Sequence, residues 1–181
     1  ISKGGVIGKL EGEDTQVVET DKELDVFSVT DTSGSMGEIC DANGCNMDKA
    51  KTANKNFIDD ILAETGNRVG LAGYSTNAPS SEFHALSNDI NSLKSMVDSW
   101  GPWGYTCICC GINKAIEGIN ADSDSSKLRV FIVLSDGETN QLCSTSGSDD
   151  TNDPAIINQA KEEAVDSACN AGSQGVIINT I

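Results

Sequence analysis

Aromatic side chains are scarce in this sequence. Phe, Tyr and Trp together make up 4% of the 181 residues, so the core cannot depend on large rings and must be packed mainly by Val, Ile, Leu and Ala. Hydrophobic residues still account for 38% of the chain, which is enough to bury a core and argues against general disorder. The length fits one ordinary domain.

Basic residues are few as well. Twelve Lys and Arg stand against 28 Asp and Glu, which gives a formal net charge of −16. Such a surface repels phosphate backbones, so we expect no nucleic-acid partner. The simplest interpretation is a solvated acidic surface that favours solubility and attracts cations. No apolar run approaches the roughly 20 residues of a membrane-spanning helix, so we expect no membrane span in this segment.

A catalytic set and a leader sequence are also missing. The single histidine, His84, has no partner that would make it a catalytic base, and no nucleophile–base–acid combination is visible. We therefore expect no enzymatic activity. The chain opens at Ile1 without a signal-peptide core, which indicates either a processed protein or a part of a longer one.

Cysteine, by contrast, is abundant for a cytosolic domain of this size. The seven cysteines are Cys40, Cys45, Cys107, Cys109, Cys110, Cys143 and Cys169. Zinc is the rival explanation, but the Cys40-x4-Cys45 spacing is too wide for the usual CxxC knuckle, and His84 lies far from any cysteine in the sequence. We favour disulfides in an oxidising compartment, with at least one cysteine free or paired outside this segment.

Short apolar runs alternate with helical patterns along most of the chain. Strands are expected at 24–29, 68–74, 81–86, 127–134 and 174–181, and helices at 48–64, 89–100, 112–119 and 155–171. This alternation predicts an α/β fold: a Rossmann-like, doubly wound, mostly parallel central sheet flanked by helices. The 127–134 run is the strongest candidate for a buried strand. Residues 1–23 are expected to be an N-terminal edge segment or linker, and residues 24–181 the domain.

Polar residues follow two of the expected strands. Asp31, Ser33 and Ser35 occupy alternate positions after the first strand, so their oxygens can converge on one face, and Gly34 allows a tight turn. Asp136 follows the central strand. In parallel sheets, ligands bind at the carboxyl ends of the strands. Hard cations such as Mg²⁺ prefer oxygen ligands of this kind, although one such loop alone is a weak signal.

Taken together, three motifs resemble the von Willebrand factor A family and its metal-ion-dependent adhesion site. That site has D-x-S-x-S after the first strand, which Asp31, Ser33 and Ser35 match. Its middle loop has a Thr in a Gly-rich pattern, which 104–112 resembles, with Tyr105 where a second Gly often stands. Its third motif, L-x-S-D-G, is similar to residues 133–137. The resemblance covers about residues 24 to 181.

The resemblance implies a site residue by residue. Ser33, Ser35 and Thr106 would ligate the metal through their hydroxyls, while Asp31 and Asp136 would act mainly through water or by fixing those hydroxyls. The cation would be Mg²⁺, with Mn²⁺ or Ca²⁺ as alternatives. An open coordination position would accept the Asp or Glu carboxylate of a protein ligand or neighbouring subunit.

The implied function is an extracellular or cell-surface, metal-dependent adhesion and protein-binding module. The alternative is a structural subunit of an extracellular filament or surface layer, in which the domain mediates assembly as a homo-oligomer or filament. Intracellular members of the family assist chelatases and ATPase machines, but the cysteine count disfavours that role.

The cysteines depart from the family pattern, because they gather around the metal motifs. We predict a local Cys40–Cys45 pair and a loop-to-helix Cys143–Cys169 pair, although sequence cannot establish connectivity. Two interpretations stay open: the disulfides stiffen the ligand loops, or they stabilise a secreted fold in general. Trp100 and Trp103 either pack the loop before Thr106 or contact a partner, and packing is favoured.

Two further expectations concern a second cation site and the end of the chain. Asp149, Asp150 and Asp153 could hold a second Ca²⁺, but a solvated loop is favoured because the EF-hand spacing is missing. Domains of this family usually end with one more helix and strand, so the domain is expected to lack these elements here. The chain would then continue beyond Ile181, another subunit would cover the edge, or residues 16–18 would fold back onto it.

Overall fold

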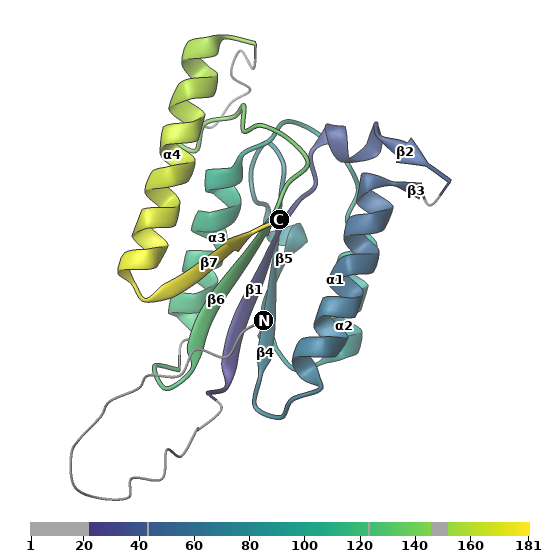
Figure 1. The fold of residues 1–181 in the computed structure, drawn as a ribbon, viewed down its shortest axis with the longest axis vertical. Coiled ribbons are helices and arrows are strands. Elements are labelled where there is room, and N and C mark those ends of the chain that lie inside the picture. Colours follow the sequence, from purple (N-terminus) through teal and green to yellow (C-terminus); the bar gives the residue numbers. More distant parts are fainter. Residues whose placement is uncertain (1–21, 43, 123, 146–151) are drawn as a thin grey trace, which may run out of the picture.

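The protein is built around one central sheet. The computed structural model describes residues 22–42, 44–122, 124–145 and 152–181 (Figure 1). The sheet has the strand order β5-β4-β1-β6-β7. Its strands are β1 Leu24–Asp31, β4 Arg68–Tyr74, β5 Phe83–Ser87, β6 Leu128–Leu134 and β7 Val176–Thr180. All neighbours pair in parallel except β5, which runs antiparallel to β4. The predicted α/β, mostly parallel fold is confirmed.

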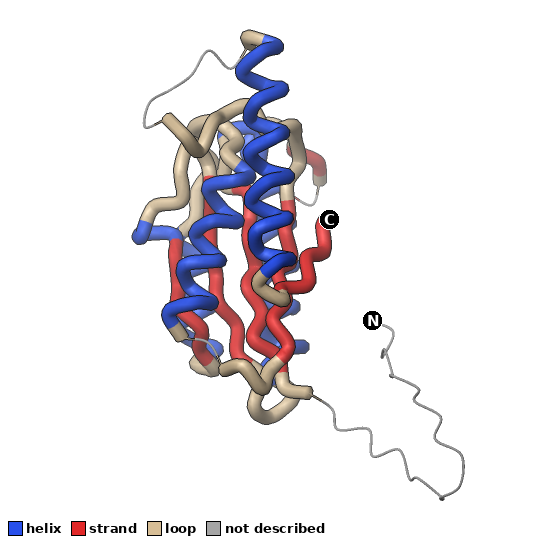
Figure 2. The backbone as a smooth tube through the Cα atoms, turned by 90° about the vertical axis from the view of Figure 1, so that its left-hand side faces the viewer, coloured by secondary structure: helices blue, strands red, loops and turns tan. Residues whose placement is uncertain are grey.

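Helices cover both faces of the sheet (Figures 1 and 2). They are α1 Asn46–Leu62, α2 Ile90–Ser99, α3 Ile108–Ala121 and α4 Pro154–Ser173. Helices α3 and α4 pack on one face, and α1 and α2 on the other. Asp89 caps α2, because its carboxylate accepts hydrogen bonds from the N–H groups of Asn91 and Ser92. Within the described residues, no helix is long and apolar enough to cross a membrane.

The core consists of two apolar layers, one on each side of the sheet. Aliphatic residues provide most of both layers, and the few rings are concentrated in one of them, where Phe27 meets Phe131 edge-on at 6.0 Å between ring centroids. Gly118 of α3 faces Phe27 so closely that a Cβ atom there would collide with the ring. The helix can therefore approach the sheet only because this position has no side chain.

Strand β6 is less buried than the sequence predicts. Phe131 and Val133 are buried under α3 and α4, but Leu128 at the start of the strand is 37% exposed and Val130 and Ile132 are only partly buried. Successive side chains of a strand point to opposite faces. On the second face, α1 and α2 lie against β4 and β5, so they leave β6 and the edge strand β7 partly uncovered.

Several elements differ from the sequence prediction or lie beyond it. Helix α3 begins at Ile108, four residues before the predicted start, so two cysteines join its first turn. A 3-10 helix at Ser80–Glu82 occupies part of the third predicted strand. A 3-10 turn η1 at Gly34–Gly37 is followed by a small hairpin, β2 Cys40–Asp41 with β3 Gly44–Cys45, that the sequence did not reveal.

Two of the sequence expectations cannot be compared with the structure. The interpretation of residues 1–21, including an edge strand at 16–18, lies outside the described residues. So does a Ca²⁺ site at Asp149 and Asp150. The third carboxylate of that hypothesis, Asp153, caps α4 by accepting a hydrogen bond from the N–H of Ala155 at 2.8 Å. Its role in the structure is therefore that of a helix cap.

Candidate metal site

The candidate site lies where the strand order reverses. From β1 the chain moves outward to β4 and β5, then returns to β6 on the other side of β1. The carboxyl ends of β1 and β6 are therefore neighbours, with Thr30 paired to Leu134. Ligands of open α/β sheets bind at such a point. Asp31 ends β1 and Asp136 follows β6 by two residues, so the fold brings the first and third motifs together.

Four of the five predicted ligand residues are joined by hydrogen bonds. Asp31 Oδ1 accepts the N–H of Ser33 at 2.8 Å, which fixes the turn after β1. The hydroxyls of Ser33 and Ser35 lie 3.0 Å apart. The hydroxyl of Ser35 donates to Asp136 Oδ1 at 2.8 Å, across a sequence separation of 101 residues. Two carboxylates and two hydroxyls thus converge on one small region.

Thr106, the fifth predicted residue, is buried between the other two loops. Its N–H donates to Asn140 Oδ1 at 2.8 Å, and its carbonyl accepts hydrogen bonds from the Asn140 N–H at 3.0 Å and the Thr139 hydroxyl at 2.9 Å. The Gly34 N–H donates to the Gly104 carbonyl at 3.0 Å, which ties this loop to the first one. Among the described residues, the Thr106 hydroxyl makes no hydrogen bond to the other four.

The charge of this region is not balanced by protein cations. Asp31 is buried, and burial raises the pKa of its carboxyl; hydrogen bonds from Ser135 and Ser33 lower that pKa, and the nearby Asp136 raises it again. In the part of the chain that the structure describes, neither Asp31 nor Asp136 forms a salt bridge with Lys or Arg. The buried carboxylate of Asp31 and the partly buried one of Asp136, beside hydroxyl oxygens, fit an oxygen-ligated divalent cation, which would supply the missing positive charge.

Two supporting residues were not predicted as part of the site. The Ser135 hydroxyl donates to Asp31 Oδ2 at 2.6 Å, and the Asn46 side-chain amide donates to Asp136 Oδ2 at 3.0 Å. Ser135 could have been found, since it directly precedes Asp136 in the third motif. Asn46 is the first residue of α1 and belongs to no motif, so only the three-dimensional arrangement reveals it.

The disulfides confirm one predicted pair and correct the other. Cys40 is bonded to Cys45, as predicted. Cys143 is bonded to Cys109, and Cys169 is free and exposed on α4, so the predicted Cys143–Cys169 pair is wrong. The loop of Cys143 does reach α4, but it does so at Glu163, whose carboxylate accepts the Cys143 N–H at 2.6 Å. Glu163 precedes Cys169 by about 9 Å of helix, which is too far for a bond from Cys143.

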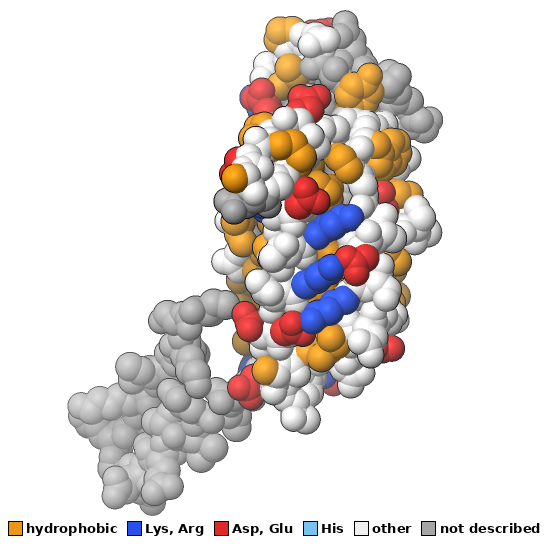
Figure 3. All heavy atoms as spheres, turned by 90° about the vertical axis from the view of Figure 1, so that its right-hand side faces the viewer, with side chains coloured by type: hydrophobic (Ala, Val, Ile, Leu, Met, Phe, Trp, Pro, Cys, Tyr) orange, Lys and Arg blue, Asp and Glu red, His pale blue; other side chains and the backbone are white. Residues whose placement is uncertain are grey.

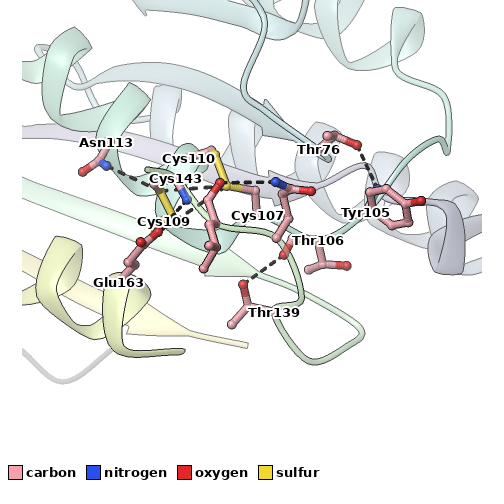
Figure 4. The surroundings of a disulfide bond; sticks show 12 residues. Thr76, Tyr105, Thr106, Cys107, Cys109, Cys110, Asn113, Thr139, Cys143 and Glu163 are labelled. Carbon is pink, nitrogen blue, oxygen red and sulfur yellow. Dashed lines mark hydrogen bonds between the residues drawn. A yellow bond between two sulfur atoms is a disulfide. The ribbon is translucent and has the colours of Figure 1, made fainter. Parts of the chain in front are cut away.

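A compact sulfur cluster stands beside the candidate site (Figure 4). It contains the Cys109–Cys143 bond and a second disulfide, Cys107–Cys110, with the Cys107 sulfur 3.6 Å from that of Cys109. The Cys109–Cys143 bond joins the start of α3, just after Thr106, to the loop that follows Asp136. It therefore links two loops of the candidate site covalently.

Glu163 anchors the same loop from α4. Burial would raise the pKa of its carboxyl, but hydrogen bonds from the Ser144 hydroxyl, the N–H groups of Cys143 and Ser144, and the Gln159 side chain outweigh burial and lower that pKa. The loop after β6 is thus held by a disulfide to α3 and by a charged hydrogen-bond acceptor on α4.

The structure resembles solved proteins of bacterial pili. It is similar to the PilB minor pilin from Streptococcus sanguinis, with a TM-score of 0.71, 19% identity, and coverage of 91% of this chain and 51% of that chain. It is also similar to the vWF domain of the type V pili tip protein Mfa5 from Porphyromonas gingivalis, with a TM-score of 0.56, 23% identity, and coverage of 65% and 39%. The pilus adhesin SpaC from Lactobacillus rhamnosus GG gives a TM-score of 0.67 at 19% identity, with coverage of 90% and 24%.

These likenesses establish the fold, since their sequence identities are low. The chain spans about half the length of the PilB chain and less of the other two. No curated protein matches the sequence. Residues 26–138, more than half of the chain, match the von Willebrand factor type A domain. The matched range begins in β1 and ends just after Asp136, so it includes all three motifs of the candidate site. The chain therefore belongs to the von Willebrand factor type A domain family.

Proposed function

We propose that this domain is a cell-surface adhesion module that binds one divalent cation and, through it, a carboxylate of a protein partner. The observation that supports this most directly is the convergence of Asp31, Ser33, Ser35 and Asp136 around a buried carboxylate without a basic partner in the described structure. The similarity to a pilus adhesin and a pilus tip protein supports a role at the cell surface. Three disulfides are consistent with an oxidising compartment.

Each residue of the site has a distinct task in this proposal. Ser33, Ser35 and Thr106 would hold the cation through their hydroxyls. Asp31 fixes the turn at Ser33, and Asp136 holds the Ser35 hydroxyl in place. A bound Mg²⁺ would supply a positive charge that attracts an anionic oxygen ligand. Since such a site orients a ligand and contains no nucleophile–base pair, we propose a binding function rather than an enzymatic one.

A structural role in a filament is the second candidate. The similarity to the PilB minor pilin extends over 91% of this chain, which favours it. In that case the carboxylate would come from a neighbouring subunit rather than from a separate ligand. The two candidates share the metal site and differ in the source of the partner.

Titration calorimetry with Mg²⁺ tests the shared site. The wild-type chain should bind one ion, Asp31→Ala should abolish binding, and Thr106→Ala and Asp136→Ala should weaken it. Asp166→Ala is a matched control, because it removes an exposed carboxylate from α4 far from the loops in sequence. Circular dichroism should confirm that each variant is folded. Unchanged Mg²⁺ affinity in folded Asp31→Ala would show that the cation binds elsewhere.

A further inference from the structure

Exposed apolar side chains lie on the loops of the candidate metal site. Seven large hydrophobic residues are exposed in the described part of the chain, and three of them lie on the loops that bear the predicted ligands. Ile39 is 60% exposed and follows Ser35 by four residues. Trp103 is 45% exposed and lies three residues before Thr106, and Tyr105 is 37% exposed and lies directly before it. Single exposed hydrophobic residues need no explanation, but a group on one functional rim marks an interaction surface.

Trp103 is held rigidly beside the first ligand loop. Its N–H donates to the Thr32 carbonyl at 2.9 Å, and its indole Nε1 donates to Glu82 Oε1 at 3.1 Å. The other carboxylate oxygen of Glu82 accepts the Thr32 hydroxyl at 2.8 Å. Thr32 lies between Asp31 and Ser33, so the buried Glu82 connects the indole to the metal loop. The ring is exposed and yet fixed in place, which lowers the entropy cost of binding a partner.

Tyr105 is placed next to the predicted ligand Thr106. Its N–H donates to the Thr76 hydroxyl at 3.1 Å, which anchors the backbone at this position. Its ring turns away from the cysteine cluster on the other side of Thr106 (Figure 4). Tyr and Trp are the residues that contribute most to the free energy of binding in protein interfaces, because they combine large apolar area with few rotatable bonds.

The charges near the site restrict what the partner can be. On the face formed by α1 and α2, Lys and acidic side chains are interleaved (Figure 3). Near the site, Lys49 in the first turn of α1 pairs with Asp41 at 2.8 Å, and farther along the same face Lys94 pairs with Asp59 at 2.6 Å. These lysines are already neutralised, and the chain as a whole has a net charge of −16. A strongly acidic partner would therefore be repelled, and a single carboxylate would be attracted only by the cation.

We infer that Ile39, Trp103 and Tyr105 form a specificity surface around the cation, and that the partner is a protein segment with one Asp or Glu next to an aromatic side chain. The inference rests on the proposed metal-dependent function and adds the chemistry of the partner to it. The carboxylate completes the coordination of the cation, and the adjacent ring packs on Trp103 and Tyr105. The surface gives the selectivity that a bare cation lacks.

Three capped dipeptides test this inference with the Mg²⁺-saturated full chain. Acetyl-Phe-Asp-amide offers both features, acetyl-Gly-Asp-amide only the carboxylate, and acetyl-Phe-Asn-amide only the ring. NMR titration should show that Phe-Asp binds about tenfold more tightly than Gly-Asp, and that Phe-Asn does not bind. Since Trp100 is buried and Trp103 exposed, protection from acrylamide quenching provides a second readout at Trp103.

Variants assign the effect to the surface. Tyr105→Ala should reduce the advantage of Phe-Asp over Gly-Asp while leaving the Mg²⁺ affinity unchanged. Trp103→Ala should reduce the same advantage, and its Mg²⁺ affinity is measured separately because this variant also removes the indole hydrogen bond to Glu82. Tyr105→Ala is the milder change, because no hydrogen bond of the Tyr105 hydroxyl is found in the described structure. Ile177→Ala is the matched control, since Ile177 is 51% exposed on the edge strand β7 and should have no effect on either peptide.

The outcomes separate this inference from the function on which it rests. If Mg²⁺ binds but Phe-Asp and Gly-Asp bind equally, the specificity surface is wrong and the metal site stands. Equal binding of Phe-Asn and Phe-Asp would also overturn the inference, because the ring would then bind without the cation. If the chain binds no Mg²⁺ at all, the proposed function itself fails.

Discussion

At the scale of single residues, Asp31 determines the geometry of the candidate site. One of its oxygens fixes the Ser33 backbone and the other holds the Ser135 hydroxyl, so both are used within the protein. Burial and the neighbouring Asp136 raise the pKa of its carboxyl. Because the pKa of Asp31 is higher in the folded state than its unfolded value of 3.8, protonation of this carboxyl stabilises the fold. The stabilisation is complete below pH 3.8 and is lost as the pH rises through the raised pKa.

The raised pKa of Asp31 leads to a prediction for Asp31→Asn. At pH 7 without metal, the wild type carries a destabilising buried negative charge on Asp31. The Asn side chain removes this charge while keeping a similar shape and an oxygen that accepts the Ser33 N–H. Without metal, the variant should melt on the order of a few degrees higher than the wild type, but it should no longer bind Mg²⁺. The difference should shrink as the pH falls toward 4. Thermal unfolding in EDTA across pH 4–8 checks this; a variant that melts lower throughout would contradict the assigned cost.

At the scale of elements, the loop after β6 is fastened to its neighbours. Three hydrogen bonds join Thr106 to Asn140 and Thr139, and the Cys109–Cys143 disulfide adds a covalent link to α3. Because two loops of the candidate site are tied to each other, their arrangement does not depend on a bound cation. This arrangement favours the stiffening interpretation of the disulfides over general stabilisation, and it can be tested separately for affinity and for stability.

Removing this disulfide should affect both properties. In Cys109→Ser/Cys143→Ser, the free energy of unfolding should fall by roughly 3–4 kcal/mol, the value expected for a loop with a sequence separation of 34. The Mg²⁺ affinity should fall about tenfold, as is typical when groups that orient metal ligands are lost. Urea unfolding and calorimetry measure the two effects. Cys169→Ser is the control, because Cys169 is free; lower stability with unchanged affinity would support general stabilisation instead.

At this same scale, elements are easier to predict from the sequence than the contacts between them. Alternating apolar runs predicted every strand of the sheet and each of the four long helices, because period-2 and period-3.6 patterns are local. The start of α3 was missed, because the predicted helix began at residue 112; in the structure Cys109 is buried and Cys110 partly buried within the first turn. The partner of Cys143 is Cys109 at the start of α3 and not Cys169 on α4, and the proximity that decides this is a tertiary property that spacing does not encode.

At the scale of the whole molecule, the sheet topology explains why the convergence of the motifs at the candidate site could be predicted. Three motifs spread over about a hundred residues meet because parallel strands place their carboxyl ends at one edge and the strand order reverses between β1 and β6. Burial of β6 could not be predicted in the same way. An apolar strand reveals that both of its faces suit burial, but only the placement of α1 and α2 shows which face is covered in this chain.

A bound cation is expected to stabilise the whole domain. A ligand that binds only the folded state stabilises it, by about 2.7 kcal/mol at a concentration 100 times its Kd. For a chain of 181 residues this should raise Tm by about 5–10 °C. Because the net charge is −16, any salt relieves repulsion, so differential scanning fluorimetry should compare Mg²⁺ with Na⁺ at equal ionic strength. The wild type should show the additional shift with Mg²⁺ and lose it on adding EDTA, whereas Asp31→Asn should respond equally to both salts. An equal response of the wild type would mean that Mg²⁺ acts only by screening.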